Sequence, residues 1–308
     1  MSIVNNSAQT TSVSDVHSYS APPLDESLYN LDPKAASLFK SLTGISDDQS
    51  LKEHILRVQA DAYKVAPYPC IHRLTFTHMV IPEMPVYSDM LKIGREREGA
   101  ILLDLGCCVG TDIRKIAFDG YPAENIIGCD LEAEFLTIGH DLFKSTPATF
   151  PAHFIPGDVF DPSLLSIVPP HDTAPEALAP NLSDLASLNP LQGRVSIIYT
   201  GKFFHLFTKE RQLHLARALA GLLSPTPSSI ICGAHMGSHN PGLYNFSNGL
   251  SKEFTLFCHS PESWTAMWDG EVFKKGFVRV EAILVKYDDI FLEETTQFCV
   301  LMWSVTRL

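Results

Sequence analysis

Residues 101–115 read ILLDLGCCVGTDIRK, and this stretch decides the fold. A short apolar run ends beside an acid, a turn with two glycines follows, and a helical pattern then begins. Such a run is typical of a strand buried in a parallel sheet. A parallel strand that ends in a glycine turn places the amino end of the next helix against a ligand, and Gly106 and Gly110 let the backbone approach that ligand closely. The stretch therefore predicts a nucleotide-binding strand–turn–helix unit.

The residues of the turn narrow the choice of nucleotide. A phosphate-binding loop needs Gly-Lys-Ser/Thr, which this stretch lacks. A dinucleotide fingerprint needs a glycine where Cys108 stands, and Asp112 would repel a pyrophosphate. A ligand that carries a positive charge and no phosphate fits better. We therefore expect S-adenosyl-L-methionine, which combines a sulfonium, an α-amino group and an adenosine, with a dinucleotide of a dehydrogenase as the disfavoured alternative.

Acids at the ends of later strands support this choice. Asp130 closes the second predicted strand, where a carboxylate can accept hydrogen bonds from both ribose hydroxyls of either nucleotide. Asp158 follows the third strand, where it can accept from the adenine amino group while the amide of Val159 donates to a ring nitrogen. Asp104 can orient the glycine turn or reach the methionine amino group. The plainer alternative for Asp104 and Asp158 is an acid that stabilises a turn.

Further side chains at the same strand ends complete the predicted cofactor site. Leu131 or Phe160 can pack on the purine face, and Thr200 lies near the end of the fourth strand. The predicted cofactor-binding residues are Asp104, Gly106, Gly110, Asp130, Leu131, Asp158, Val159, Phe160 and Thr200.

The alternation of short apolar runs and helical patterns predicts an α/β fold with a doubly wound sheet. The last two runs, at residues 277–289 and 297–308, are too close together for a parallel crossover, so they should pair antiparallel. We expect seven strands, mostly parallel with an antiparallel last strand, which is not the architecture of a dinucleotide dehydrogenase. The other predicted strands are 101–106, 125–130, 152–158, 195–201 and 228–237, and the predicted helices are 111–119, 133–145, 209–224 and 260–276.

Composition divides the chain into three parts. Residues 1–27 are rich in Ser, Thr, Asn and Pro, which predicts a disordered leader. Helical patterns over residues 28–98 predict an N-terminal cap, with Asp32 capping its first helix. Residues 99–308 form the predicted cofactor-binding domain, and 169–193 read as a proline-rich surface insertion.

Several motifs together resemble one family. DLGCCVGTDIRK, NIIGCDLEAEFLTIGHDLF, IPGDVFD, FFHLFTKERQ and GAHMGSHNPG resemble fungal class I methyltransferases of secondary metabolism, above all those that methylate carboxylic acids in meroterpenoid and polyketide pathways. AYKVAPYPCIHRLTF resembles the stretch before the fold in that family. The resemblance covers about residues 28–308. It implies a Rossmann-like class I methyltransferase fold that binds S-adenosylmethionine through Asp130 with Leu131 and Asp158 with Val159. Lys202 departs from the family, which more often has a small or neutral residue there.

The acceptor of the methyl group should meet the ends of the fourth and fifth strands. A carboxylate is already ionised at neutral pH and needs no base, whereas a phenol or enol can require one. His205 is the best candidate for a catalytic base, although it can equally pack between its phenylalanine neighbours. Lys202 can steer an acidic substrate, and the plainer alternative is a solvated lysine.

Other residues are candidates for contact with the acceptor. Tyr63 and Tyr68 can reach it from the cap, and Trp264 on the last helix can form an aromatic wall or pack in the core. His235 and His239 follow the fifth strand in a glycine-rich loop and can hydrogen-bond the acceptor. No third ligand accompanies this pair, so we expect no metal site. The predicted substrate-binding residues are Tyr63, Lys202, His235 and Trp264.

Charge and composition exclude several other functions. The formal charge of −12 disfavours nucleic acid and anionic membrane surfaces as partners. Seven scattered cysteines without a CxxC pair indicate reduced thiols, and no secretory signal is visible, so we expect a cytoplasmic monomer or homodimer. The sequence predicts an S-adenosylmethionine-dependent O-methyltransferase of a small, apolar secondary metabolite, most plausibly a carboxylate. The alternatives are methylation of an enol or phenol and, more distantly, a non-catalytic scaffold.

Overall fold

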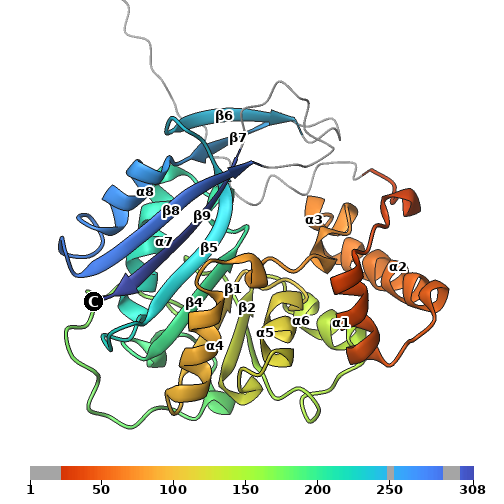
Figure 1. Ribbon diagram of the computed structural model, residues 1–308, viewed down its shortest axis with the longest axis horizontal. Coiled ribbons are helices and arrows are strands. Elements are labelled where there is room, and N and C mark those ends of the chain that lie inside the picture. Colours follow the sequence, from red (N-terminus) through yellow and green to blue (C-terminus); the bar gives the residue numbers. More distant parts are fainter. Residues whose placement is uncertain (1–21, 248–252, 287–298) are drawn as a thin grey trace, which may run out of the picture.

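A seven-stranded sheet forms the centre of the protein, in the order β3-β2-β1-β4-β5-β9-β8 (Figure 1). The computed structural model describes residues 22–247, 253–286 and 299–308, so most of the predicted leader lies outside the described residues. The strands of the sheet are β1 (Ile101–Leu105), β2 (Ile126–Asp130), β3 (His153–Pro156), β4 (Val195–Gly201), β5 (Ile230–Gly237), β8 (Val278–Lys286) and β9 (Cys299–Arg307).

The directions of the strands confirm the predicted fold class. β1 to β5 pair in parallel, and β9 runs antiparallel to both β5 and β8. All five residues of β1 are buried, as expected for a strand whose two faces are both covered by helices. The parallel strands therefore end at one common edge, which carries the glycine turn.

Helices cover both faces of the sheet (Figure 1). α4 (Tyr87–Glu96) and α5 (Thr111–Phe118) pack on one face, and α7 (Lys209–Leu222) and α8 (Pro261–Trp268) pack on the other. Successive residues of β4 alternate between these two cores, with Ile197 in the first and Ile198 in the second. α6 (Ala133–Leu142) packs against β2, β3 and the N-terminal helices.

The N-terminal helices lie beside α6 (Figure 1). They are α1 (Pro33–Thr43), α2 (Asp48–Val65) and α3 (Pro69–His72). The side chain of Asp32 accepts from the amides of Lys34 and Ala35, so the predicted cap of α1 is present. α2 is hydrogen-bonded to the end of α6, since Nε2 of His54 lies 2.9 Å from the carbonyl oxygen of Leu142.

Two expectations about local structure were wrong. The last helix ends at Trp268 instead of residue 276, because Asp269 leaves the helical path and its Oδ1 accepts from the amide of Gly276 at 2.7 Å. The loop expected after β5 contains an antiparallel hairpin of β6 (Gly242–Ser247) and β7 (Glu253–Cys258). Short 3-10 turns complete the described elements: Glu26–Leu28, Thr75–Thr77, Ile81–Glu83, Ala123–Asn125, Leu182–Asp184, Asn189–Leu191 and Phe204–Leu206.

A partly buried carboxylate connects three elements next to the glycine turn. Oδ1 of Asp112, in the first turn of α5, accepts from the amides of Val80 and Ile81 at 2.8 and 3.0 Å. Its Oδ2 accepts from the hydroxyl of Tyr199 on β4 at 2.8 Å. Asp112 therefore also has a structural role that the sequence did not predict, because internal donors occupy both of its oxygens.

Asp112→Ala should lower the free energy of unfolding by about 3 kcal/mol, because it leaves two amides and one hydroxyl without a buried acceptor. Tyr199→Phe removes a single donor and should cost about 1 kcal/mol. Urea unfolding followed by circular dichroism measures both values. Equal losses in the two variants would contradict the role of Asp112 as a shared acceptor.

Candidate active site

The glycine turn between β1 and α5 has a left-handed backbone at three residues. φ is +77° at Gly106, +50° at Cys108 and +73° at Gly110. A Cβ at Gly106 would collide with the ring of Phe203, so glycine is required there both for its backbone angle and for space. The turn brings the carboxyl edge of β1 into contact with the residues that follow β4.

The buried side chain of Arg114 stabilises the glycine turn by hydrogen bonds to its backbone. Nη1 of Arg114 donates to the carbonyl oxygens of Val109 and Gly110 at 3.1 and 3.2 Å. Its guanidinium also lies over the rings of Phe143 and Phe150, at 4.6 and 4.7 Å from their centroids. Arg114 therefore holds the carbonyl oxygens of Val109 and Gly110 toward the protein interior. The opposite side of the turn is left for a ligand.

Asp130, at the end of β2, is brought against the turn as predicted for a ribose-binding acid. Its Oδ2 accepts from the amide of Cys108 at 2.7 Å and its Oδ1 from the amide of Glu132 at 3.1 Å. Burial raises the pKa of Asp130 above its usual range, although these amides oppose the shift. The hydroxyl of Tyr68 donates to Glu132 at 3.0 Å, which brings the N-terminal helices to the same place.

Asp104 is a buried acid without a hydrogen-bond donor in the described part of the chain. Its side chain lies on β1 and is 2% exposed. Burial raises its pKa well above the usual range, and the nearby Asp112 and Asp130 add to this shift. A cation placed at this end of β1 would relieve the cost of that buried charge.

The residues after β3 form an open turn. Asp158 is exposed, and its Oδ1 accepts from the amide of Phe160 at 2.9 Å, which is the geometry of the plainer alternative. Among the described residues, no acceptor receives the amide of Val159. The ring of Phe160 packs edge-on to Phe207, whereas Leu131 is 46% exposed. Of the two apolar residues predicted to pack on the purine, Leu131 therefore has the more accessible side chain.

Three predicted residues lie at the end of β4. Thr200 is fully buried, and its hydroxyl has no partner in the described parts of the chain. Lys202 is exposed, with φ of +53° and its amide donating to the carbonyl of Ala234 at 2.6 Å. His205 sits in the short turn that follows. Burial, and secondly the charge of Lys202, lower the pKa of His205 to about 4.

Three predicted substrate residues are buried or have partners within the chain. The hydroxyl of Tyr63 donates to the carbonyl of Pro22 at 2.8 Å, beside the N-terminal helices. Trp264 is fully buried among aromatic rings, as in the core-packing alternative. His235 is buried within β5 and does not lie in a loop, because β5 extends to Gly237; His239 lies beyond the strand and is exposed.

Some residues of the site were missed in the sequence. Cys70 from α3 and Cys108 are in hydrogen-bond contact through their thiols, which lowers the pKa of Cys70 and raises that of Cys108. Phe203 covers Gly106, and His259 packs on Trp264 with ring centroids 5.2 Å apart. No local motif marks these residues. Only Phe203 lies in a recognisable pattern, the aromatic run FFHLF at residues 203–207.

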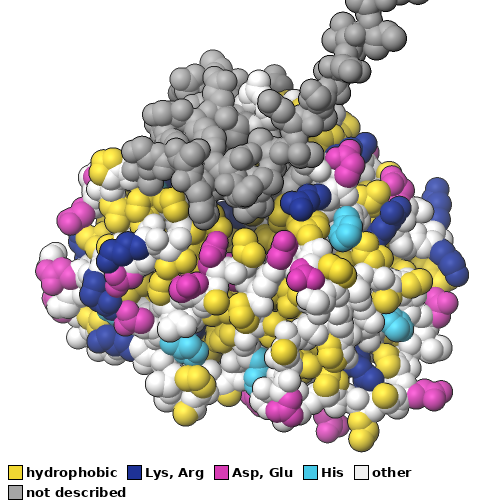
Figure 2. Space-filling model, turned by 180° about the vertical axis from the view of Figure 1, so that it is seen from behind, with side chains coloured by type: hydrophobic (Ala, Val, Ile, Leu, Met, Phe, Trp, Pro, Cys, Tyr) yellow, Lys and Arg dark blue, Asp and Glu magenta, His cyan; other side chains and the backbone are white. Residues whose placement is uncertain are grey.

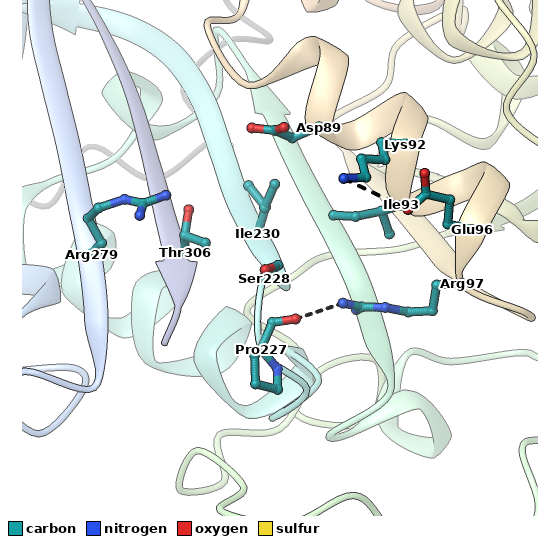
Figure 3. Close-up of a pocket in the computed structure, with 10 residues that line it drawn as sticks. All are labelled: Asp89, Lys92, Ile93, Glu96, Arg97, Pro227, Ser228, Ile230, Arg279 and Thr306. Atoms are coloured by element: carbon teal, nitrogen blue, oxygen red, sulfur yellow. Dashed lines mark hydrogen bonds and ion pairs between the residues drawn. The ribbon is translucent and has the colours of Figure 1, made fainter.

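A pocket on another part of the surface belongs to no predicted site (Figure 3). It has a volume of about 460 Å³ and lies between α4 and the amino end of β5, where Arg97 donates to Pro227. Within the described ranges, His, Cys, Asp and Glu side chains form no group of three or more that could hold a metal ion.

On the face in Figure 2, Lys and Arg side chains are scattered among acidic ones and, among the residues described there, form no continuous basic track. Across residues 22–247, 253–286 and 299–308, no helix combines the length and the apolar character that crossing a bilayer requires.

Comparison with known proteins gives consistent relatives. Residues 24–77 match the meroterpenoid methyltransferase N-terminal domain family. The Asnovolin E/Chermesin D methyltransferase nvfJ of Aspergillus novofumigatus is 30% identical over 79% of this chain and 78% of its own. Methyltransferase ausD of Aspergillus calidoustus is 30% identical over 70% of this chain and 68% of its own length. O-methyltransferase phiE of a fungal species is 31% identical over 74% of this chain and 67% of its own length.

Solved structures are similar in fold alone. An S-adenosylmethionine dependent methyltransferase from Mesorhizobium loti has a TM-score of 0.43 at 13% identity, covering 74% of this chain and all of that chain. A SAM dependent methyltransferase from Aquifex aeolicus has a TM-score of 0.40 at 11% identity, covering 80% and 97%.

The free energy of unfolding should decrease as the pH is lowered, because the buried His259 is forced to take up a proton. Burial, and secondly Lys209, lower the pKa of His259 to about 4. The unfolded chain binds this proton near the usual value of about 6.5, so between these values acidification favours unfolding, by up to about 3 kcal/mol. His259→Asn, whose amide can keep the bond to Ser263, should reduce this slope in urea unfolding from pH 7 to 4.5. An unchanged slope would contradict the assignment.

Proposed function

The chain belongs to the family of fungal methyltransferases that these relatives represent, and we propose that it is an S-adenosylmethionine-dependent O-methyltransferase that methylates the carboxylate of a small, largely apolar natural product. In this proposal residues 99–308 form the catalytic domain and 28–98 the cap. The observation that carries the choice of a carboxylate is that Nδ1 of His205 is buried without a partner in the described residues, which together with the charge of Lys202 lowers the pKa of His205 to about 4.

The donor groups at the carboxyl edge fit S-adenosylmethionine. Asp104 is a buried carboxylate that lacks a donor within the described residues, and it suits the cationic methionine end. Asp130 lies at the end of the neighbouring strand, within 2.7 Å of the amide of Cys108, and suits the ribose hydroxyls. The amide of Val159 and the exposed side chain of Leu131 suit the adenine. When bound, this cofactor supplies an activated methyl group on a sulfonium.

The residues after β4 would align the acceptor and do not need to remove a proton from it. A ring with a pKa of about 4 is neutral at pH 7 but is a poor base for a phenol or enol. An ionised carboxylate needs no base, and the exposed ammonium of Lys202 can attract it to the edge. The reaction then depends on alignment and on exclusion of water.

Exposed apolar residues near the ends of β4 and β5 support an apolar acceptor. Leu206 is 60% exposed beside His205, and Leu243 on β6 is 71% exposed. β6 and β7 are joined to the end of β5, because the amide of Ser238 donates to the carbonyl of His259 at 3.0 Å. An apolar body could cover these leucines while its carboxylate faces Lys202.

Calorimetric titration with S-adenosylhomocysteine, with NADH as the control, tests the cofactor. Micromolar binding of the first and none of the second is expected. A panel of apolar carboxylic acids, each paired with an alcohol or phenol of the same skeleton, then tests the acceptor with a radiolabelled methyl donor. Methylation of the alcohols and phenols alone would overturn the proposed carboxylate.

Two matched variants separate attraction from proton removal. Lys202→Gln should raise KM for the preferred acid about tenfold, because it removes the attracting charge, and should leave kcat within about twofold. His205→Gln should leave kcat for the acid within about threefold, because no proton is removed. A loss of kcat of about a hundredfold in His205→Gln on the acid would contradict this division of roles.

Binding of S-adenosylmethionine should depend on the ionisation of Asp104. Because the pKa of Asp104 is raised, acidification neutralises it well before an exposed acid, and affinity for the cationic cofactor should fall as the pH is lowered. Asp104→Asn should weaken binding by about 1–3 kcal/mol and flatten this pH profile. Methylthioadenosine, which lacks the cationic groups, is the control ligand. A profile for it as steep as for the cofactor would contradict the assignment.

A further inference from the structure

Four buried ring nitrogens without a hydrogen-bond partner gather behind the ends of β4 and β5. They are Nδ1 of His205, Nε2 of His235, Nε2 of His259 and Nε1 of Trp264, and we name these side chains the imidazole cluster. The ring centroid of Trp264 is 4.6 Å from that of His235 and 5.2 Å from that of His259. Buried polar atoms nearly always have a partner, so these nitrogens need partners that the described residues do not supply, which ordered water or a ligand can provide.

The position of the proton on His235 follows from its neighbour. Nε1 of Trp303 lies 3.0 Å from Nδ1 of His235. An indole nitrogen can only donate, so Nδ1 of His235 must be the acceptor and must be unprotonated. A neutral imidazole carries one proton, which therefore resides on Nε2. The unpartnered nitrogen of His235 is thus a hydrogen-bond donor.

The donor of His235 is directed into the imidazole cluster. Trp303 lies on β9, and the two nitrogens of an imidazole point in diverging directions, so Nε2–H is turned away from β9. His235 is 2% exposed and Trp264 is fully buried, whereas His205 is partly exposed and turns its Nδ1 inward. His205 therefore connects the cluster with the carboxyl edge.

The rings of the cluster are neutral at physiological pH. Burial lowers the pKa of His235 well below its usual value, and His205 and His259 add to the shift. Burial also lowers the pKa of His205 and of His259 to about 4. The cluster can therefore recognise a group by directed hydrogen bonds and not by formal charge.

We infer that the imidazole cluster is the subsite for an oxygen atom of the acceptor molecule, and that His235 donates to this oxygen from Nε2 while Trp303 fixes its tautomer. The inference rests on the proposed function. Nε1–H of Trp264 is a second fixed donor, because an indole only donates. Two fixed donors select a group with several lone pairs, such as a carboxylate or a ketone, and disfavour an ammonium.

His259 supplies a hydrogen-bond acceptor to the imidazole cluster, whereas His235 and Trp264 supply donors. Its Nδ1 lies 2.9 Å from the hydroxyl of Ser263, which also lies 3.1 Å from the carbonyl of Ser260. When this hydroxyl donates to the carbonyl, Nδ1 of His259 donates to the hydroxyl and Nε2 is left as an acceptor. An acceptor molecule with a hydroxyl beside its carbonyl or carboxyl group satisfies both sides of the cluster.

Long-range ¹H–¹⁵N correlation spectroscopy of the full chain, labelled in histidine, tests the tautomer directly. With S-adenosylhomocysteine added, His235 should show a protonated Nε2 and a bare Nδ1, and Trp303→Phe should lose this preference. Cyclohexanecarboxylate should move the Nε2 proton downfield, whereas cyclohexylamine should not. A protonated Nδ1 in the wild type, or an Nε2 proton that neither probe moves, would overturn the inference.

Kinetics on the best acid of the acceptor panel give the second test. Trp303→Phe and His235→Phe should each raise KM for the acid about tenfold, while the Kd for S-adenosylhomocysteine stays within about twofold. His235→Gln can place an amide donor near the lost Nε2 and should recover most of the affinity. Wild-type methylation with unchanged KM in both phenylalanine variants would overturn this inference alone. Cofactor binding without methylation of any acceptor would instead overturn the proposed function, and the spectroscopic test would still decide the tautomer.

Discussion

Three carboxylates, the buried Asp104 and the partly buried Asp112 and Asp130, crowd the glycine turn, and the rest of the site depends on how each is compensated. Burial raises the pKa of Asp104, Asp112 and Asp130, and Asp112 and Asp130 raise that of Asp104 further. Asp112 accepts from two amides and a tyrosine, and Asp130 accepts from two amides. Asp104 has no such donor in the described residues. The buried cation nearest the turn, Arg114, is directed to carbonyl oxygens and does not pair with these acids. A cationic ligand is the compensation that remains, and this is a reason for the fold to take a sulfonium cofactor.

The carboxyl edge of the sheet is thereby divided into two halves of different character. The half built from β1, β2 and β3 holds acids and free amides. The half built from β4 and β5 holds neutral histidines and aromatic rings, and Lys202 is the cation that follows β4 directly. Phe203 joins the halves, because its ring lies over Gly106. A methyl group carried on the acidic half would face an acceptor held on the neutral half, so the division of charge also sets the direction of the transfer we propose.

The sequence predicted best those features that depend on neighbours along the chain. The apolar run of β1, its glycines, and the acids after β2 and β3 are contiguous patterns, and the short connection between the closing strands forces their antiparallel pairing. Features that depend on distant partners were missed or misread. The structural role of Asp112 was missed because two of the groups that donate to it, on Val80 and Tyr199, lie far away in sequence. His235 was placed in the loop after the fifth strand although it falls within the predicted strand 228–237, and the pairing of β5 with β9 keeps it in that strand. The hairpin of β6 and β7 lies among glycines and prolines that read as a loop.

Burial decides the chemistry of this site more than residue type does. His205 after β4 suggests a base when the sequence is read, but its burial and the nearby charge of Lys202 lower its affinity for protons. The same enclosure makes it a better hydrogen-bonding group, because it stays neutral and its tautomer can be fixed by a neighbour, as Trp303 does for His235. A site of this kind holds an oxygen that is already nucleophilic and excludes the water that would solvate it. It suits an acceptor whose proton is lost before binding, which a carboxylic acid satisfies at neutral pH and a phenol does not.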